Sequence, residues 1–265
     1  MHSFSIFHEY EKSQWTLKDI AWDKIERDRV TVEYIHLLKS AVMGECNSIA
    51  ALHGFLNESV ADYDFAAYAS LWGAQELQHH FAFRTYLEKI GEAIAPGKVE
   101  ATRPPYPPGN THAATLATNI ISELTVCHVY HRVSKAVDEP VLRDILARVS
   151  QDESRHAREF LYYTRRRLDQ HPEEMGSVLE TFYVYVGDPE KKIKHPVSVF
   201  KGAVPELQNY ETIDDGFDYF MGLADGNYAK LSQKLYQTFS NLTGYALSNL
   251  ASVRRALASL PDAVA

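Results

Sequence analysis

Two copies of a Glu-x-x-His signature give this chain side chains that could bind metal, and each copy follows a lone upstream glutamate at nearly the same spacing. Residues three apart on an α-helix share one face, so the glutamate and histidine of each copy can bind from one side. Four carboxylates and two imidazoles in this arrangement are what a helical bundle needs to hold two metal ions in its core. The predicted ligands are Glu45, Glu76, His79, Glu123, Glu153 and His156.

The ligand types favour iron or manganese. Carboxylates and neutral imidazoles suit these metals, and two cysteines cannot form the thiolate cluster that zinc or an iron–sulfur centre would favour. Four buried glutamates without metal would repel one another and destabilise the fold. A single Glu-x-x-His is usually a surface pair, and the alternative for the matched pair is a decayed or differently used bundle. We predict two iron ions, with manganese possible.

The signatures lie within four segments that should form the helices of a bundle. Apolar residues recur at helical period in the ranges 28–56, 63–90, 111–137 and 141–170. Between the second and third helices, residues 91–111 are rich in proline and glycine, so they cannot form a regular helix. This segment is long enough to cross from one end of the bundle to the other, as a ferritin-like bundle with one crossover requires.

The turns within each helix pair support this assignment. Each upstream glutamate and its signature are equally far from a polar break, which is Asn57–Asp62 in the first pair and Val137–Pro140 in the second. Proline cannot continue a helix, so the second break is a strong one. At ~1.5 Å per residue, both pairs should meet about 23 Å from their turns.

The remaining segments are expected to add helices around the bundle. A short helix is predicted around Thr16–Glu26, another at Met175–Val186, and one or two more within Glu206–Leu260. Loops are predicted at Gly187–Pro189 and His195–Pro196. The expected fold is therefore all-α, a ferritin-like four-helix bundle with a long crossover and additional C-terminal helices. We expect one domain over 1–265, with the bundle core at about 28–170 and the helical extension at about 171–265.

Composition excludes several other classes of protein. Hydrophobic residues make up 45% and charged residues 23%, which is ordinary for a globular protein, and the net charge of −8 argues against nucleic-acid binding. The first residues lack the basic start and apolar run of a signal peptide, and no stretch has the length of a membrane span. We therefore expect a cytoplasmic protein with no membrane partner. Cys46 and Cys127 are expected to be small core residues.

The residues around the signatures resemble the soluble acyl-carrier-protein desaturases. The similarity includes Ser122–Val133, Asp138–Val141 and Ala147–His156, with an Asp-Glu-x-Arg-His form of the second signature, and also Trp72–His79 and Arg84–Leu87. The resemblance implies an O2-dependent di-iron enzyme that removes hydrogen from an acyl chain held in a narrow apolar channel. It also implies an acidic acyl carrier protein as the partner, a ferredoxin-type electron donor and a homodimer.

The same resemblance assigns roles to individual residues. The six predicted ligands match the family's metal ligands, and Asp152 matches an aspartate that orients a ligand histidine. Gln75 and Gln78 replace charged residues that the family commonly has in the first signature, and Val126 stands where plant members have a threonine. These departures leave the metal site intact but leave open whether the reaction is desaturation, hydroxylation or another oxidation.

Three other functions compete with a desaturase. A di-iron oxygenase could hydroxylate or N-oxygenate another metabolite, although Val149 replaces the extra histidine that N-oxygenases of this bundle class carry. A ferritin or rubrerythrin would be a storage or peroxide-scavenging protein, but storage ferritins are shorter and rubrerythrins need more cysteines. A ribonucleotide reductase small subunit would be expected to have a tyrosine where this chain has Phe83.

A basic run ends the fourth predicted bundle helix. In an acidic protein it could dock an acidic carrier, or it could simply complement the helix dipole. The run and its basic neighbours are Arg158, Arg165, Arg166, Arg167, Lys191, Lys192 and Lys194.

Overall fold

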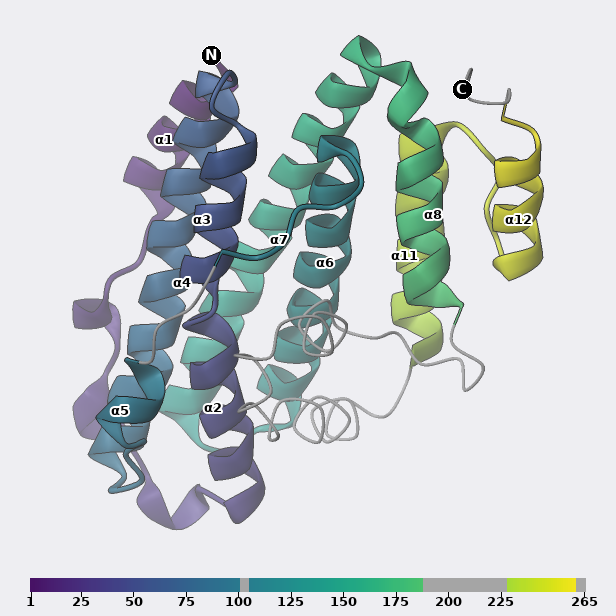
Figure 1. The fold of residues 1–265 in the computed structure, drawn as a ribbon. Coiled ribbons are helices and arrows are strands. Elements are labelled where there is room, and N and C mark those ends of the chain that lie inside the picture. The colour runs from purple at the N-terminus through teal and green to yellow at the C-terminus, as the bar shows by residue number, and fades with distance from the viewer. Residues whose placement is uncertain (101–104, 188–227, 261–265) are drawn as a thin grey trace.

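The computed structural model describes residues 1–100, 105–187 and 228–260, and this part of the chain contains helices and no strand. Figure 1 shows the long helices lying side by side as a bundle, with further helices along one flank. The prediction of an all-α, ferritin-like helical bundle is confirmed. Among the described helices, none combines the length and the apolar character needed to span a membrane.

Four helical columns form the bundle. Three are single helices, α4 (Tyr63–Lys89), α6 (His112–Ala136) and α7 (Pro140–Gln170). The fourth column consists of α2 (Val32–Glu45) followed by α3 (Ser48–Glu58). The columns pair as predicted, because α2 and α3 pack against α4, α6 packs against α7, and α4 also contacts α7.

Both predicted turns lie where the sequence placed them, and each carries a side-chain cap. The Asp62 side chain accepts a hydrogen bond from the backbone N–H of Phe65 at 3.1 Å at the start of α4. At the start of α7, the Glu139 side chain accepts hydrogen bonds from the backbone N–H groups of Val141 and Leu142 at 3.3 and 2.7 Å. These bonds satisfy donors that a helix start leaves without partners. The caps therefore fix where each hairpin turns.

The prediction of one unbroken helix over residues 28–56 is wrong. The helix is interrupted at Cys46 and Asn47, where the Asn47 N–H bonds to the Gly44 carbonyl at 3.0 Å, one residue closer than in an α-helix. Glycine and asparagine are poor helix formers, so the tighter turn is easily accommodated here. Glu45 consequently becomes the last residue of α2, immediately before the break.

The predicted short helix around Thr16–Glu26 is also wrong. The helix lies earlier, as α1 (His2–Ser13), and three 3-10 turns follow it, η1 (Leu17–Asp19), η2 (Trp22–Lys24) and η3 (Arg27–Arg29). The apolar residues of this stretch are spaced alternately by two and three positions, which does not match the α-helical period. The segment therefore winds along the bundle in short turns rather than as one helix.

The crossover between α4 and α6 is mostly irregular, as predicted. It contains one short helix, α5 (Pro96–Val99), and residues 101–104 lie outside the described part. Beyond them the chain is tied to α3, because the Tyr106 N–H bonds to the Ala50 carbonyl at 3.0 Å. A Cβ atom on Gly54 would lie 2.9 Å from the Tyr106 carbonyl oxygen, so glycine is needed for this close approach.

Additional helices cover one flank of the bundle. The predicted helix Met175–Val186 is present as α8, which packs on α6 after the turn η4 (Pro172–Glu174). Two more helices, α11 (Tyr228–Thr243) and α12 (Leu250–Ala258), fall within the predicted range 206–260 and pack against α8. The predicted loops at 188–189 and 195–196 and the range 206–227 lie outside the described residues.

In the part of the chain that the structure describes, the core consists of two apolar clusters, and every bundle column contributes to both. On α4, for example, Phe65 and Trp72 belong to one cluster, whereas Phe83 and Leu87 belong to the other. The signature residues occupy the stretch between them on each column. The bundle therefore holds one polar layer between two apolar ones, where side chains of opposite columns must face one another.

Candidate metal centre

The six predicted ligands converge in this polar layer. One ligand atom from each of Glu45, Glu76, His79 and Glu153 forms a group whose atoms lie within 4.8 Å of one another. A second group of the same kind contains Glu76, Glu123, Glu153 and His156. Glu76 and Glu153 belong to both groups, so the two groups adjoin and share two carboxylates.

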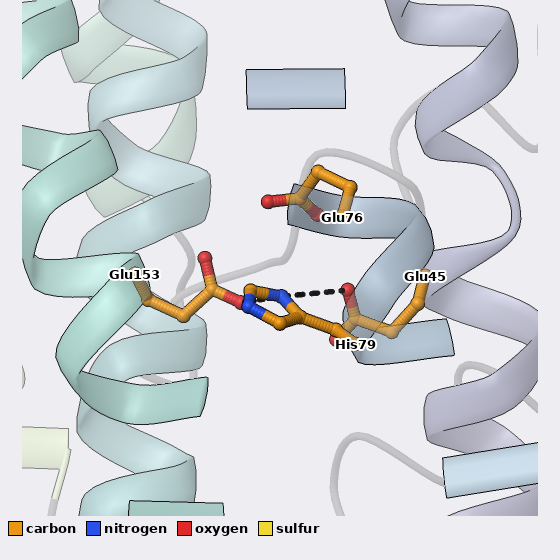
Figure 2. Close-up of side chains that lie close together, drawn as sticks. All are labelled: Glu45, Glu76, His79 and Glu153. Carbon is orange, nitrogen blue, oxygen red and sulfur yellow. Dashed lines mark ion pairs between the residues drawn. The ribbon is translucent and has the colours of Figure 1, made fainter. Parts of the chain in front are cut away.

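Figure 2 shows how three columns supply the first group. Glu45 points inward from the end of α2, Glu153 points toward it from α7, and Glu76 and His79 reach between them from α4. The His79 Nδ1 atom lies 3.8 Å from Glu45 Oε2 and 3.3 Å from Glu153 Oε1. The imidazole therefore faces two carboxylates that arrive from opposite sides.

Both histidines present the same ring nitrogen to the carboxylates. His156 Nδ1 lies 2.9 Å from Glu76 Oε1 and 3.4 Å from Glu123 Oε2. The other nitrogen of each ring, Nε2, points away from the group and has a partner of its own. A ring held in this way keeps Nδ1 available as a ligand atom and fixes its direction.

The partners of the two Nε2 atoms differ in charge. His79 Nε2 lies 3.0 Å from Asp152 Oδ2, a carboxylate, whereas His156 Nε2 lies 2.8 Å from the side-chain oxygen of Gln75. The predicted role of Asp152, orienting a ligand histidine, thus has a matching contact to His79. Asp152 also accepts hydrogen bonds from Trp15 Nε1 at 2.7 Å and from Arg155.

The ligand set fits metal ions by two observations. The buried atoms Glu76 Oε1, Glu153 Oε1 and His79 Nδ1 lie close to imidazole or carboxylate atoms but make no hydrogen bond of suitable geometry, which is costly unless something else satisfies them. Ligand atoms on opposite sides of one ion are about 4 Å apart, twice a bond of roughly 2 Å, so a 4.8 Å group can close around an ion with small adjustments. The donor set, carboxylates with imidazole, suits iron and manganese.

The electrostatics of the polar layer also indicate that its carboxylates need bound cations. Burial and the nearby Glu153 carboxylate raise the pKa of Glu76 to about 8, and burial with the neighbouring carboxylates raises the pKa of Glu123 well above its ordinary value. Burial would also raise the pKa of Glu153, but the two imidazoles outweigh burial and lower it. Without cations the carboxylates cannot all ionise, because they repel one another in a dry interior.

Two further residues hold these glutamates and were not identified from the sequence. The Tyr130 hydroxyl donates to Glu45 Oε1 at 2.5 Å, and Trp72 Nε1 donates to Glu123 Oε1 at 3.2 Å. A sequence signal existed for both, since Trp72 is four residues before Glu76 and Tyr130 is seven after Glu123, spacings that share a helix face. Trp15 gave no such signal, because it reaches the site from outside the bundle columns.

Neither cysteine belongs to a ligand group. Cys46 is buried in an apolar cluster, as predicted, whereas Cys127 is only half-buried and its thiol lies 3.3 Å from the Ser150 carbonyl oxygen.

Most of the basic run on α7 is engaged within the protein. Arg166 pairs with Asp62 and with Asp64, and its guanidinium lies 4.6 Å from the centre of the Tyr163 ring. Other pairs join Arg167 to Glu174, and Arg158 to Glu9 and Glu159. Arg165 is exposed, and Lys191, Lys192 and Lys194 lie outside the described residues.

A cavity of about 320 Å³ opens beside the six residues. All four glutamates of the two groups line it, together with residues of α2, α3, α6, α8 and the segment after residue 105. This volume falls in the range of small-molecule sites in proteins. Apolar side chains such as Phe55, Trp72 and Val126 share its wall with polar ones.

Comparisons with known proteins relate the chain to solved structures alone. No protein-family model and no curated protein sequence matches it. Three structures of R2-like ligand-binding oxidase variants, each with a reconstituted Mn/Fe cofactor, align with TM-scores of 0.57 over 93% of both chains. Sequence identity is 14% for two of them and 15% for the third. The chain therefore has the ferritin-like helical bundle fold of an R2-like ligand-binding oxidase.

Proposed function

We propose that this protein is an O2-dependent oxidase with two iron ions, or iron and manganese, held by Glu45, Glu76, His79, Glu123, Glu153 and His156. The observation that carries the proposal is the pair of adjoining groups that share Glu76 and Glu153. Two divalent cations would offset the charges of four glutamates, which removes the repulsion described above. The R2-like neighbours hold a Mn/Fe cofactor in the same fold, which supports either metal combination.

When bound, such ions supply the redox chemistry that reduces O2 and oxidises a substrate. The protein's own residues position and protect them. Asp152 and Gln75 orient the two imidazoles, and Tyr130 and Trp72 each hold one carboxylate outside the shared pair. The apolar clusters on both sides of the polar layer keep bulk water away.

For the substrate, the sequence resemblance supports an acyl chain carried as a thioester on acyl carrier protein, with desaturation as the reaction and a ferredoxin-type protein as reductant. The cavity beside the metal site gives such a chain a place to bind. Exposed Arg165 is the part of the basic run most available to an acidic carrier. A homodimer in the cytoplasm remains part of this proposal.

A second candidate is hydroxylation or another oxidation of a metabolite that is not carrier-bound. One observation favours it. The cavity wall contains many hydroxyl, amide and carboxylate groups, among them Ser48, Glu58, Thr115 and Asn119. A plain acyl chain has no group that would satisfy them, whereas a more polar molecule has.

The test has two stages. The metal content of protein reconstituted with Fe(II) should be two ions per chain, and the reduced protein should consume O2.

In the second stage, a panel of acyl carrier proteins is supplied with a ferredoxin reductant, and the mass of the acyl chain is measured. Loss of two hydrogens indicates a desaturase, and gain of one oxygen indicates a hydroxylase. Two bound ions with O2 consumption but unchanged acyl mass would favour the second candidate. A protein that binds no iron would contradict the proposal.

A further inference from the structure

Within the described residues, the charged groups that line the cavity all have the same sign. In the described part of the chain, its charged wall residues are glutamates, and no lysine or arginine reaches it. Four of these glutamates form the candidate metal site. The fifth, Glu58, is the last residue of α3 and belongs to neither ligand group. Its role is not explained by metal binding.

Glu58 has one oxygen engaged and one available. Its Oε1 accepts a hydrogen bond from the Thr115 hydroxyl at 3.0 Å, while Oε2 is buried and has no hydrogen-bond partner. His112 Nδ1 lies 3.8 Å from Oε1, too far for a hydrogen bond. The side chain is 15% exposed, so water satisfies it only in part. A carboxylate in this setting should strongly favour a cationic or hydrogen-bond-donating partner.

Neighbouring groups of the cavity wall add further hydrogen-bond acceptors. The Thr115 hydroxyl donates to Glu58, and the Asn119 amide donates one N–H to the Thr115 carbonyl at 2.8 Å, so Asn119 Oδ1 can accept. Ser48 is 6% exposed, and its Oγ has no hydrogen-bond partner, so this hydroxyl can accept or donate. Together with Glu58, these groups can accept hydrogen bonds from a molecule that supplies several donors.

Charge balance leads to the same conclusion. Two divalent ions would neutralise the four glutamates of the metal site, which leaves Glu58 as the remaining acidic group of the cavity wall, with the His112 imidazole at 3.8 Å from Oε1 as a basic neighbour behind the wall. A ligand with one positive charge would complete the balance, whereas a carboxylate or phosphate head group would find no basic partner among the described wall residues.

The distance between the two ends of the cavity follows from α6. Thr115, which contacts Glu58, precedes Glu123 by eight positions on this helix, so the two ends are about 12 Å apart at 1.5 Å per residue. The same wall includes apolar residues such as Phe55 and Trp72.

We infer that the substrate of this site is an aliphatic amine whose protonated amino group pairs with Glu58, while a carbon at the far end of its chain lies against the metal centre. This inference rests on the second candidate of the proposed function, oxidation of a metabolite that is not carrier-bound, and is an alternative to the carrier-bound acyl chain. It deepens that candidate by naming the substrate class and by placing oxidation on a carbon remote from the nitrogen.

The test measures binding without turnover. Protein loaded with Mn(II) in the absence of O2 is titrated calorimetrically with 1-octylamine, 1-octanol and octanoate, which share one chain and differ in the head group. Octylamine is an ammonium at pH 7, as a lysine side chain is. It should bind roughly tenfold more tightly than octanol, and octanoate should bind most weakly.

Variants identify the partner of the amine. Glu58→Gln should weaken octylamine binding by roughly tenfold and leave octanol binding unchanged, because only a charge is removed. Glu58→Asp keeps the charge and should restore part of the affinity. Glu180→Gln is the matched control, since Glu180 is an exposed glutamate on α8 beside the wall residue Thr181, and it should change nothing.

The outcomes are distinguishable. Equal binding of octylamine and octanoate, or an octylamine affinity that Glu58→Gln leaves unchanged, would overturn the inference. The second result would indicate an amine bound directly to the metal. Neither result would contradict the proposed oxidase function, because metal content and O2 consumption are measured separately. Failure to load two ions would instead overturn the proposed function, and this inference with it.

Discussion

His156 is held by a neutral amide, because its Nε2 lies 2.8 Å from the side-chain oxygen of Gln75. The equivalent atom of His79 faces the carboxylate of Asp152, whose pKa is lowered because hydrogen bonding and charge from His79 and the charge of Arg155 outweigh the effect of burial. A carboxylate partner makes an imidazole a more basic ligand than an amide does. The two candidate metal positions are therefore unequal, although their ligand types are the same.

We predict that this asymmetry appears in metal affinity. Asp152→Asn should weaken binding of the ion beside His79 by roughly 10- to 100-fold, and Gln75→Glu should strengthen binding of the ion beside His156. Titration with Mn(II), followed by calorimetry, would resolve two binding steps and show which one moves. If both variants shift the same step, the pairing of each histidine with its own ion is wrong.

Metal stoichiometry should separate the shared ligands from the unshared ones. Glu153→Gln should remove both ions, because Glu153 belongs to both groups, whereas Glu45→Gln should remove one. Metal analysis of purified, reconstituted variants checks this, with Glu180→Gln as a control that should keep two ions. Loss of a single ion from both variants would contradict the shared role of Glu153.

The stability of metal-free protein should fall as the pH rises from about 5 to 8. Folded Glu76 keeps its proton up to a pKa of about 8, whereas in the unfolded chain it loses the proton near its ordinary value of 4.5. The folded state thus binds more protons in this window, so raising the pH favours unfolding. The pKa of His79 and of His156 is also raised, because the neighbouring carboxylates outweigh the effect of burial. Above pH 6.5 the folded state therefore keeps these protons while the unfolded chain loses them, which further lowers the stability as the pH rises. The lowered pKa of Glu153 changes the stability only below about pH 4.5, where the unfolded chain takes up this proton first.

Metal binding should reverse this dependence, because the ligands must lose their protons. Thermal melts at pH 5, 6, 7 and 8 would show a Tm that falls for metal-free protein and a metal-induced increase in Tm that grows with pH. Calorimetry in buffers with different ionisation enthalpies should register proton release at pH 7. A metal-induced increase in Tm that is the same at every pH would contradict the pKa of Glu76.

Substitution of Gly54 should disturb the segment that closes the cavity. Gly54→Ala places a Cβ 2.9 Å from the Tyr106 carbonyl oxygen, a backbone atom that can move only with its segment. We expect a loss of about 1–3 kcal/mol in the free energy of unfolding. Gly44→Ala is the matched control, because nothing lies within 4 Å of the added Cβ, and it should be neutral or stabilise α2 by about 0.5–1 kcal/mol. Urea denaturation would measure both, and equal effects would contradict the close approach.

Arg166 should act mainly in folding. It joins α7 to the start of α4 through Asp62 and Asp64, so Arg166→Gln should lower the free energy of unfolding by about 1 kcal/mol. Arg165→Gln, an exposed neighbour, should not change stability. Denaturation in low and high salt would show a loss for Arg166→Gln that salt reduces. If both variants are equally stable, the Arg166 pairs contribute nothing measurable.

The sequence by itself determined the bundle and the set of residues that meet in its core. Helical period and turn residues are local properties, and two residues equally far from a turn must lie level on paired helices. Glu45 with Glu76, and Glu123 with Glu153, could therefore be paired before any coordinates were known. The break after Glu45 could not be predicted from the sequence. At Asn47 the backbone N–H bonds to the residue three positions earlier rather than four, and this change leaves the apolar period almost unchanged.

Only the tertiary structure decided what surrounds that set. Trp15 reaches Asp152 from the N-terminal segment, Gln75 rather than a carboxylate holds His156, and Glu58 shares the cavity with the metal-site glutamates. Each of these contacts joins elements that are far apart in sequence, and no local pattern records which distant side chain will fill the remaining space. The sequence therefore specified which residues form the candidate centre, while packing of distant segments specified its asymmetry and the character of its cavity.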